Sequence, residues 1–356
     1  MALLTPPHQD DLEITLIGPN VGECVIIHHK SNWLLIDSCK DKTSGLPAAL
    51  VYLNGLNVGP DQVKVIACSH WHDDHFKGLG QLYEAYPAAQ FWMSGALAVK
   101  DFVTLVEAYR DWPAGSEPHT SGLKELTTCI DLARKRGSAP NFSTHDQRMW
   151  LAADGSAELW SLSPSSEMIR QGYQDISQLI PTAWGEKNAA AIKGPNHIAV
   201  AMHFRAGSHS VLLGSDLEEH NNPLTGWSAI LASKTKPPQL ASLYKVAHHG
   251  SVTAEHPGVW GNLLTDHPVS VLTPFSRSRL PRDTDIARIK AASSRVFLSS
   301  KQTDSENKRK GALGKMTASK KMRVLHGLPG VIQCRVSTSD PNAEWSVILD
   351  GLATKL

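Results

Sequence analysis

The chain has 356 residues and a formal net charge of +1, and 41% of its residues are hydrophobic. This length suits one large α/β domain with a sizeable core, and the near-neutral charge gives no global indication of a polyanionic partner. No apolar stretch is long enough to span a bilayer, so we expect neither a membrane segment nor a membrane partner. The five cysteines have no regular spacing, which favours buried, reduced thiols in a cytoplasmic protein over a disulfide framework.

The first quarter of the chain predicts strands and one helix. The predicted strands cover 12–18, 22–28, 33–38 and 63–68, and the apolar spacing after Gly45 predicts a helix over 46–57. The second and third strands form a probable hairpin, with His28 and His29 expected at its surface. This alternation of strands and helices is typical of an α/β domain.

The most informative stretch of the sequence follows the fourth strand, at 69–78. It places His70, His72, Asp74 and His75 within six positions, and imidazole nitrogen with carboxylate oxygen is the ligand set that zinc and its neighbours prefer. Residues two apart at a strand end lie on one side, so His70 and His72 can bind one ion. Asp74 and His75, beyond the turn, can then face a second ion. The alternative is a polar loop of hydrogen-bonded histidines, which this density of ligands disfavours.

The H-x-H-x-D-H pattern of 70–75, with an apolar strand before it and a glycine-containing turn and helix after it, resembles the signature of the metallo-β-lactamase superfamily of metallohydrolases. The resemblance implies a four-layer αββα sandwich, formed by a single domain over 1–356, with a dinuclear metal site at one edge. The Ile-Asp step that ends the third strand resembles the first motif of that superfamily. Asp37 is therefore expected to support the metal ligands from behind, as ligating imidazoles require outer partners. Its alternative role is to form a turn or to cap a helix.

A stretch without strand patterning follows the predicted strand at 90–93. From about 96 to 150 the sequence predicts two helices, over 97–112 and 121–136, separated by a segment rich in proline and glycine. Such a helical insertion over the site edge would shape substrate access. It could equally form a dimer or contact an assembly partner, and the sequence does not decide between these roles.

Past a predicted strand at 157–163, two apolar strands are predicted to form a hairpin that ends in Gly214-Ser215-Asp216. The superfamily resemblance implies that Asp216 bridges the two cations. It also implies that a histidine near 197 completes the shell of the first metal, whereas competence-type relatives have asparagine there. Asn196 and His197 are adjacent, so either His197 is a ligand or Asn196 holds a water molecule or substrate.

The third informative stretch is the apolar run that ends in His248-His249-Gly250-Ser251. It resembles the hydrolase domain of ComEC/Rec2-type competence proteins. Adjacent residues at a strand end point in opposite directions, so we expect only one of the two histidines to bind the second metal with Asp74 and His75. The His-Gly step resembles that of other superfamily members, which implies His249 as the ligand and leaves His248 as a hydrogen-bond donor or general acid; the reverse assignment stays open. Ser251 is expected to contact substrate oxygens.

The C-terminal third predicts strands at 269–275 and 295–300 and a closing hairpin over 331–349. Residues 277–323 hold fourteen Lys or Arg against four Asp or Glu, and the part at 301–321 is basic and rich in small polar residues. This segment would contact a polyanion by counterion release or form a solvated, flexible loop.

Together these residues predict a hydrolase with two divalent ions, zinc first and manganese as an alternative. A metal-bridging hydroxide and the carboxylates Asp74 and Asp216 would then carry the chemistry, with His248 as a proton donor. The basic C-terminal third and the His-His-Gly-Ser resemblance favour a phosphodiester substrate, nucleic acid above a small phosphodiester. The alternatives are a lactonase or other ester hydrolase, and a non-catalytic metal-binding subunit of a larger assembly.

Overall fold

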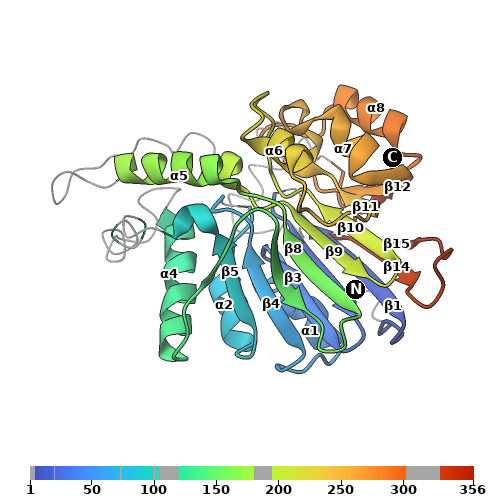
Figure 1. Cartoon of the computed structure of the whole chain (residues 1–356). Coiled ribbons are helices and arrows are strands. Elements are labelled where there is room, and N and C mark those ends of the chain that lie inside the picture. The colour runs from blue at the N-terminus through green and yellow to red at the C-terminus, as the bar shows by residue number, and fades with distance from the viewer. Residues whose placement is uncertain are drawn as a thin grey trace, which may run out of the picture.

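A computed structural model describes residues 5–19, 21–72, 74–98, 102, 104, 120–179, 195–301 and 329–356. Within these residues the chain forms two eight-stranded sheets (Figure 1). The first sheet has the strand order β15 (Ser346–Asp350), β14 (Gly330–Ser337), β1 (Asp11–Gly18), β2 (Cys24–His29), β3 (Asn32–Ile36), β4 (Val63–Cys68), β5 (Gln90–Ser94) and β6 (Asn141–Ser143). The second has the order β16 (Thr354–Lys355), β13 (Arg295–Leu298), β12 (Leu264–Leu272), β11 (Ala241–Lys245), β10 (His209–Leu213), β9 (Met202–Ala206), β8 (Ala157–Ser161) and β7 (Gln147–Leu151).

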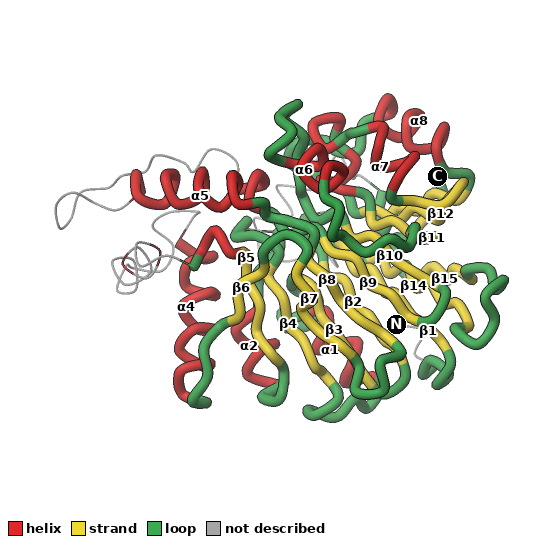
Figure 2. The backbone as a smooth tube through the Cα atoms, in the orientation of Figure 1, coloured by secondary structure: helices red, strands yellow, loops and turns green. Residues whose placement is uncertain are grey.

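Helices cover the outer face of each sheet, which gives the four-layer αββα sandwich that the sequence predicts (Figure 2). The helices of the first sheet are α1 (Ala48–Gly55), α2 (Leu79–Ala85) and α4 (Thr120–Lys135). Those of the second sheet are α6 (Gly226–Ala232), α7 (Pro257–Asn262) and α8 (Asp283–Ala292). A further helix, α5 (Ser166–Leu179), and four short 3₁₀ turns, η1 (Gly95–Leu97), η2 (Pro195–Ile198), η3 (Ala247–Gly250) and η4 (Val252–Ala254), connect the layers.

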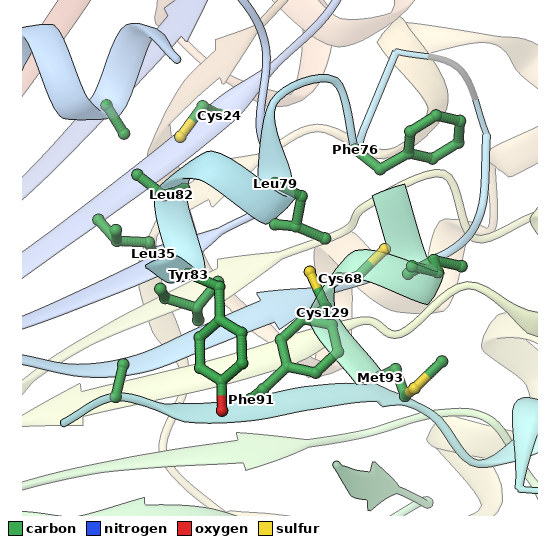
Figure 3. Close-up of a cluster of buried hydrophobic side chains, with 14 of the residues drawn as sticks. Cys24, Leu35, Cys68, Phe76, Leu79, Leu82, Tyr83, Phe91, Met93 and Cys129 are labelled. Atoms are coloured by element: carbon green, nitrogen blue, oxygen red, sulfur yellow. The ribbon is translucent and has the colours of Figure 1, made fainter. Parts of the chain in front are cut away.

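Strand β4 shows why the metal-binding stretch begins from a continuous apolar run. Val65 and Ala67 point into the core between the two sheets, whereas Ile66 and Cys68 point outward into the core under α2 and α4 (Figure 3). A strand that is buried on both faces has no polar alternation. The loop after β4 is therefore anchored by two cores, which gives the ligands that it carries a rigid base.

The helical insertion is shorter than the sequence predicts. The helix expected over 121–136 is confirmed as α4, but strands β6 and β7 lie within the predicted strand-free stretch of 96–150. These two strands were missed because β6 has only three residues and β7 is half-exposed, with no continuous apolar run and a register shift against β8 between Arg148 and Trp150. Most of the helix predicted over 97–112, and nearly all of the basic segment at 301–321, lie outside the described residues.

All five cysteines are buried and free, as the sequence predicts. Among the described helices, none combines the length and apolar character that crossing a bilayer requires.

Two histidines, one on β2 and one on β9, are buried in the core, and burial lowers the pKa of both. Neither His28 nor His29 is at the surface: they are 4% and 1% exposed, and the His28 ring packs on Trp33. His203, on β9, is equally buried and its Nε2 donates to the Gln239 carbonyl at 3.0 Å. Burial lowers the pKa of the His28 and His203 imidazoles from 6.5 to about 4. Both side chains are therefore neutral core residues at neutral pH.

This burial predicts a pH-dependent contribution to stability from His203. Between pH 4 and 6.5 the unfolded chain binds a proton that the folded chain does not, so stability is full above about pH 6.5 and is lost as the pH falls towards 4. We expect the free energy of unfolding, wild type minus His203→Gln, to fall by about 2 kcal/mol between pH 7 and 4.5. Urea unfolding at both pH values measures it, with exposed His145→Gln as the control. Parallel pH profiles for the wild type and His203→Gln would show that the assignment is wrong.

Candidate metal centre

The predicted ligands meet at one edge of the sandwich, where strands from both sheets end. In the first sheet, β3 and β4 run parallel, so Asp37 and the 70–75 loop follow their carboxyl ends side by side. In the second sheet, β10, β11 and β12 are parallel and place Asp216, His249 and Phe275 at the corresponding edge. The centre is thus assembled from segments that are far apart in the sequence (Figure 1).

One group of ligand atoms comes from both sheets. Asp74, His75, Asp216 and His249 are all buried, and one ligand atom of each lies within 4.8 Å of the others. His249 Nε2 lies 3.1 Å from Asp74 Oδ2 and 3.5 Å from Asp216 Oδ2, and His75 Nε2 lies 3.4 Å from Asp216 Oδ2. Two imidazoles and two carboxylates in this arrangement could hold one divalent cation.

A second group shares Asp216 with the first. It consists of His70, His72 and Asp216, again within 4.8 Å of one another, and His70 Nε2 lies 3.9 Å from Asp216 Oδ2. The structure therefore divides the loop as the sequence predicts, with His70 and His72 on one side and Asp74 and His75 on the other. Asp216 is the only residue in both groups, which is the placement expected of a bridging carboxylate.

Several polar atoms of this cluster are placed to bind a cation and not to form hydrogen bonds with one another. His70 Nε2, His75 Nε2, Asp74 Oδ1 and Asp216 Oδ1 are buried and make no hydrogen bond within the described part of the chain. Buried polar atoms without a hydrogen bond are costly in a folded protein, and each of these is a ligand atom for zinc. Four such atoms in one place therefore indicate a site for divalent ions.

The charges of the metal-free cluster balance across the two sheets. Burial opposes ionisation of the His75 and His249 imidazoles, but the adjacent carboxylates of Asp216 and Asp74 overcome it and raise the pKa of both, that of His249 to about 10. Reciprocally, the imidazoles hold the pKa values of both carboxyls below their usual range, although burial alone would raise them. Burial and the neighbouring His75 lower the pKa of His70. A cation that replaces these protons leaves every ligand in its binding form.

Asp37 contacts the loop from behind the ligand groups. Its carboxylate accepts hydrogen bonds of 2.7 Å from the Ser69 backbone N–H, the Ser69 hydroxyl and His75 Nδ1. Burial raises the pKa of this carboxyl, and these contacts counteract the shift. With Nδ1 donating to Asp37, the lone pair on His75 Nε2 faces Asp74 and Asp216.

The two adjacent histidines lie in a left-handed turn and not on a strand. Strand β11 ends at Lys245, and His248 (φ 46°), His249 (φ 53°) and Gly250 (φ 83°) all have positive φ. This conformation costs free energy in residues with a side chain and is common at functional sites. The turn directs His249 into the buried cluster and leaves His248 outside both ligand groups. The expected separation of the two rings is present, but its cause is the turn and not strand alternation.

His248 is held beside the cluster by polar neighbours. Its Nδ1 lies 3.2 Å from Glu218 Oε1 and 3.1 Å from the Thr253 hydroxyl, and its Nε2 lies 3.3 Å from Asn196 Nδ2. The ring is 17% exposed and its centroid is 6.2 Å from that of His249. An imidazole that is oriented by a carboxylate and is partly open to solvent has the properties of a proton donor or acceptor.

Two predicted residues have other roles in the structure. His197 is not in either ligand group: its Nε2 lies 3.1 Å from Asp175 of α5. The reason is the η2 turn, in which consecutive side chains diverge, so that Asn196 reaches His248 while His197 pairs with the helix. Ser251 uses its hydroxyl to accept the Thr253 N–H and so caps η4, which is a structural role.

Several neighbours of the centre were not predicted. Glu23 and Lys245 form a buried ion pair behind the ligands, Thr273 contacts His249, and Phe275 stacks on the His249 ring at a centroid distance of 5.2 Å. A lysine inside the apolar run of β11 was the available sequence signal, because lysine is rarely buried without a partner. The sequence gives no indication that Glu23, Thr273 and Phe275 lie at the centre, because only the fold brings them there.

The fold and the ligand groups define a metal-binding αββα protein of the hydrolase type. Residues 17–288 match the family model described as the metallo-beta-lactamase superfamily, and the chain belongs to that superfamily of metal-dependent hydrolases.

Solved structures with a similar fold include a metallo-beta-lactamase HARLDQ motif mutant from Cronobacter sakazakii. It has 13% identity and a TM-score of 0.35, covering 86% of this chain and 82% of that one. Another is MEM-A1, a subclass B3 metallo-beta-lactamase from a soil metagenome library, with 14% identity, a TM-score of 0.35 and coverages of 78% and 89%. SMB-1 bound to 2-mercaptoethanesulfonate has 11% identity, a TM-score of 0.37 and coverages of 72% and 87%. Among curated proteins, none matches this chain.

Proposed function

We propose that this protein is a phosphodiesterase that uses two divalent metal ions, zinc or manganese, and that its substrate is nucleic acid. His70, His72 and Asp216 would hold one ion, and Asp74, His75, Asp216 and His249 would hold the other. When bound, such a pair of ions polarises the scissile ester and supplies an activated water at neutral pH.

The choice of a phosphodiester substrate rests on a cationic turn that starts at the metal centre. Phe275 stacks on His249, and its backbone pairs with Leu280 in both directions, at 2.8 and 3.1 Å. The chain between them is therefore folded into a closed turn, whose exposed residues include Arg277 and Arg279. Guanidinium groups are suited to phosphate, whereas a neutral lactone gains nothing from them. The His248-His249-Gly250-Ser251 resemblance to competence-protein hydrolase domains supports the same choice.

The chain's own residues can complete the reaction around such a substrate. His248 is oriented by Glu218 at Nδ1, and its Nε2 accepts a hydrogen bond from Asn196 Nδ2. When Nε2 takes up a proton from solvent in place of that hydrogen bond, it would give this proton to the leaving alkoxide. Asp37 keeps His75 aligned. Because all five thiols are buried and unpaired, we place the protein in the cytoplasm, where such thiols stay reduced.

Comparative hydrolysis tests the proposal. We expect the zinc- or manganese-loaded protein to cleave bis(p-nitrophenyl) phosphate and single- or double-stranded DNA or RNA, with little turnover of a lactone panel or a chromogenic β-lactam. Turnover of lactones alone would make it an ester hydrolase. No turnover of any ester, together with normal metal uptake, would favour a metal-binding subunit.

The cationic turn provides a sharper test. Arg277→Ala/Arg279→Ala is expected to raise KM for nucleic acid about tenfold, and to lower the slope of log KM against log salt concentration by about 2, because two phosphate contacts are lost. Arg134→Ala/Lys135→Ala, on the exposed last turn of α4, removes the same charge elsewhere and is the matched control. Equal effects of the two double variants would show that the turn does not bind the substrate.

A further inference from the structure

A buried ion pair lies directly behind the metal ligands and joins the two sheets. Glu23 precedes β2 in the first sheet and Lys245 ends β11 in the second, and the two side chains are 2% and 1% exposed. Lys245 Nζ pairs with Glu23 Oε1 and also donates to the Ser215 carbonyl at 3.2 Å. Ser215 has a positive φ of 47° and immediately precedes Asp216. The lysine therefore holds the strained turn that presents the shared carboxylate.

Glu23 reaches the other ligands. Its Oε2 accepts a 2.6 Å hydrogen bond from the Thr273 hydroxyl, whose oxygen lies 3.0 Å from His249 Nδ1. When Nδ1 donates along this path, the lone pair on His249 Nε2 faces Asp74 and Asp216. The Glu23 backbone N–H donates to the Asp74 carbonyl at 3.0 Å, and its Oε1 lies 3.8 Å from His75 Nδ1. Glu23 thus reaches three ligands of one group: Asp74 through its backbone, His75 through its carboxylate, and His249 through the Thr273 hydroxyl.

We infer that the Glu23–Lys245 pair is a positioning device for the metal ion held by Asp74, His75, Asp216 and His249. This inference rests on the proposed two-ion site. The ligands of this ion come from different sheets, and the pair fixes the separation of those sheets at the site. Through the Thr273 hydroxyl it also helps to orient His249, whose Nδ1 lies 3.2 Å from the Thr273 backbone carbonyl as well, as outer partners of metal ligands do elsewhere.

A purely structural role is the competing explanation, because buried ion pairs also occur away from functional sites. This chain contains one for comparison: Glu13 on β1 is 0% exposed and accepts from Arg335 Nε at 2.6 Å. Its other partners are Thr15 and Tyr52, and it belongs to none of the candidate ligand groups. Loss of either pair should destabilise the fold, since a buried charge is left alone. Only loss of the Glu23–Lys245 pair should change metal affinity.

The test measures Zn²⁺ affinity of the full-length chain by competition with a chromophoric chelator, together with thermal unfolding of the metal-free protein. Glu23→Gln is expected to weaken one of two bound ions by about 10- to 100-fold and to leave the other within about threefold. Thr273→Val keeps the side-chain shape and leaves the charges of Glu23 and Lys245 in place, so this variant should fold even if Glu23→Gln does not. It should weaken the affinity for the same ion about tenfold. Glu13→Gln is the matched control: it should lower the melting temperature and leave both affinities unchanged.

Each outcome decides the inference. If Glu23→Gln and Thr273→Val both bind two ions with wild-type affinity, the pair is structural and the inference is wrong, while the two-ion proposal stands. If the wild type takes up fewer than two Zn²⁺ ions, both the inference and the proposed function fail. Selective weakening of one ion in both variants, with Glu13→Gln unchanged, supports the inference.

Discussion

Asp216→Ala is expected to lower hydrolysis by at least about 10³-fold and to remove both metal ions, because this carboxylate is the one residue common to the two ligand groups. His72→Ala, which changes only the group of His70, His72 and Asp216, should lose one ion and keep the other. Folding should survive, because Asp216 Oδ1 makes no hydrogen bond within the described part of the chain and the neighbouring imidazoles can lose their protons once the carboxylate is removed. Activity with each substrate and metal content by elemental analysis measure the effect.

A matched variant separates this effect from general damage to the fold. Asp41 is also a buried aspartate, but its hydrogen bonds lie within its own turn, to Thr43 and Ser44. Asp41→Asn should reduce stability while metal content and activity stay near wild type. If Asp216→Ala kept two ions, or kept activity within tenfold of the wild type, the bridging assignment would be wrong.

His248→Ala is expected to lower kcat by about 10²- to 10³-fold while both metal ions remain bound, because His248 lies outside the ligand groups and is the proposed proton donor. The loss should depend on the leaving group. A p-nitrophenolate leaves without a proton, so bis(p-nitrophenyl) phosphate should lose much less activity than an alkyl phosphodiester such as a dinucleotide. Steady-state kinetics on both substrates, for the wild type and the variant, measure the difference.

His249→Ala is the natural comparison, because it changes the neighbouring imidazole of the same turn. It should lose one metal ion and reduce activity with both substrates alike. A His248→Ala protein that loses metal, or that loses equal activity with good and poor leaving groups, would show that His248 is not the general acid.

The fold followed from the sequence wherever a segment is buried on a simple pattern. The apolar run of β4 predicted a strand because the segment is buried on both faces. The alternation of β1 also predicted a strand, although its polar residues Glu13 and Thr15 are buried and not exposed to solvent. The short β6 and the half-exposed β7 were missed because their packing depends on neighbours from distant parts of the chain. His28 was misplaced for the same reason: its burial comes from the sheet and from Trp33, not from its position in a hairpin.

At the candidate site, too, the sequence predicted what depends on local spacing and not what depends on the tertiary structure. The spacing of 70–75 is local, so the division of its ligands between two groups could be read from the sequence. The separation of His248 from His249 was predicted for an incorrect reason, since backbone angles in a left-handed turn have no pattern in the residue types. His197 and Asn196 are adjacent, and only the η2 turn and the position of α5 decide which one faces the centre. Glu23 and Thr273 lie 250 positions apart and become neighbours only when the two sheets pack together.

The central claim is that two cations share Asp216 at the edge where the sheets meet, and anomalous scattering from crystals of the zinc-loaded protein tests it most directly. We predict two anomalous peaks per chain, one beside His70 and His72 and the other beside His75 and His249, with the Asp216 carboxylate between them. A single peak, or peaks away from Asp216, would contradict this account.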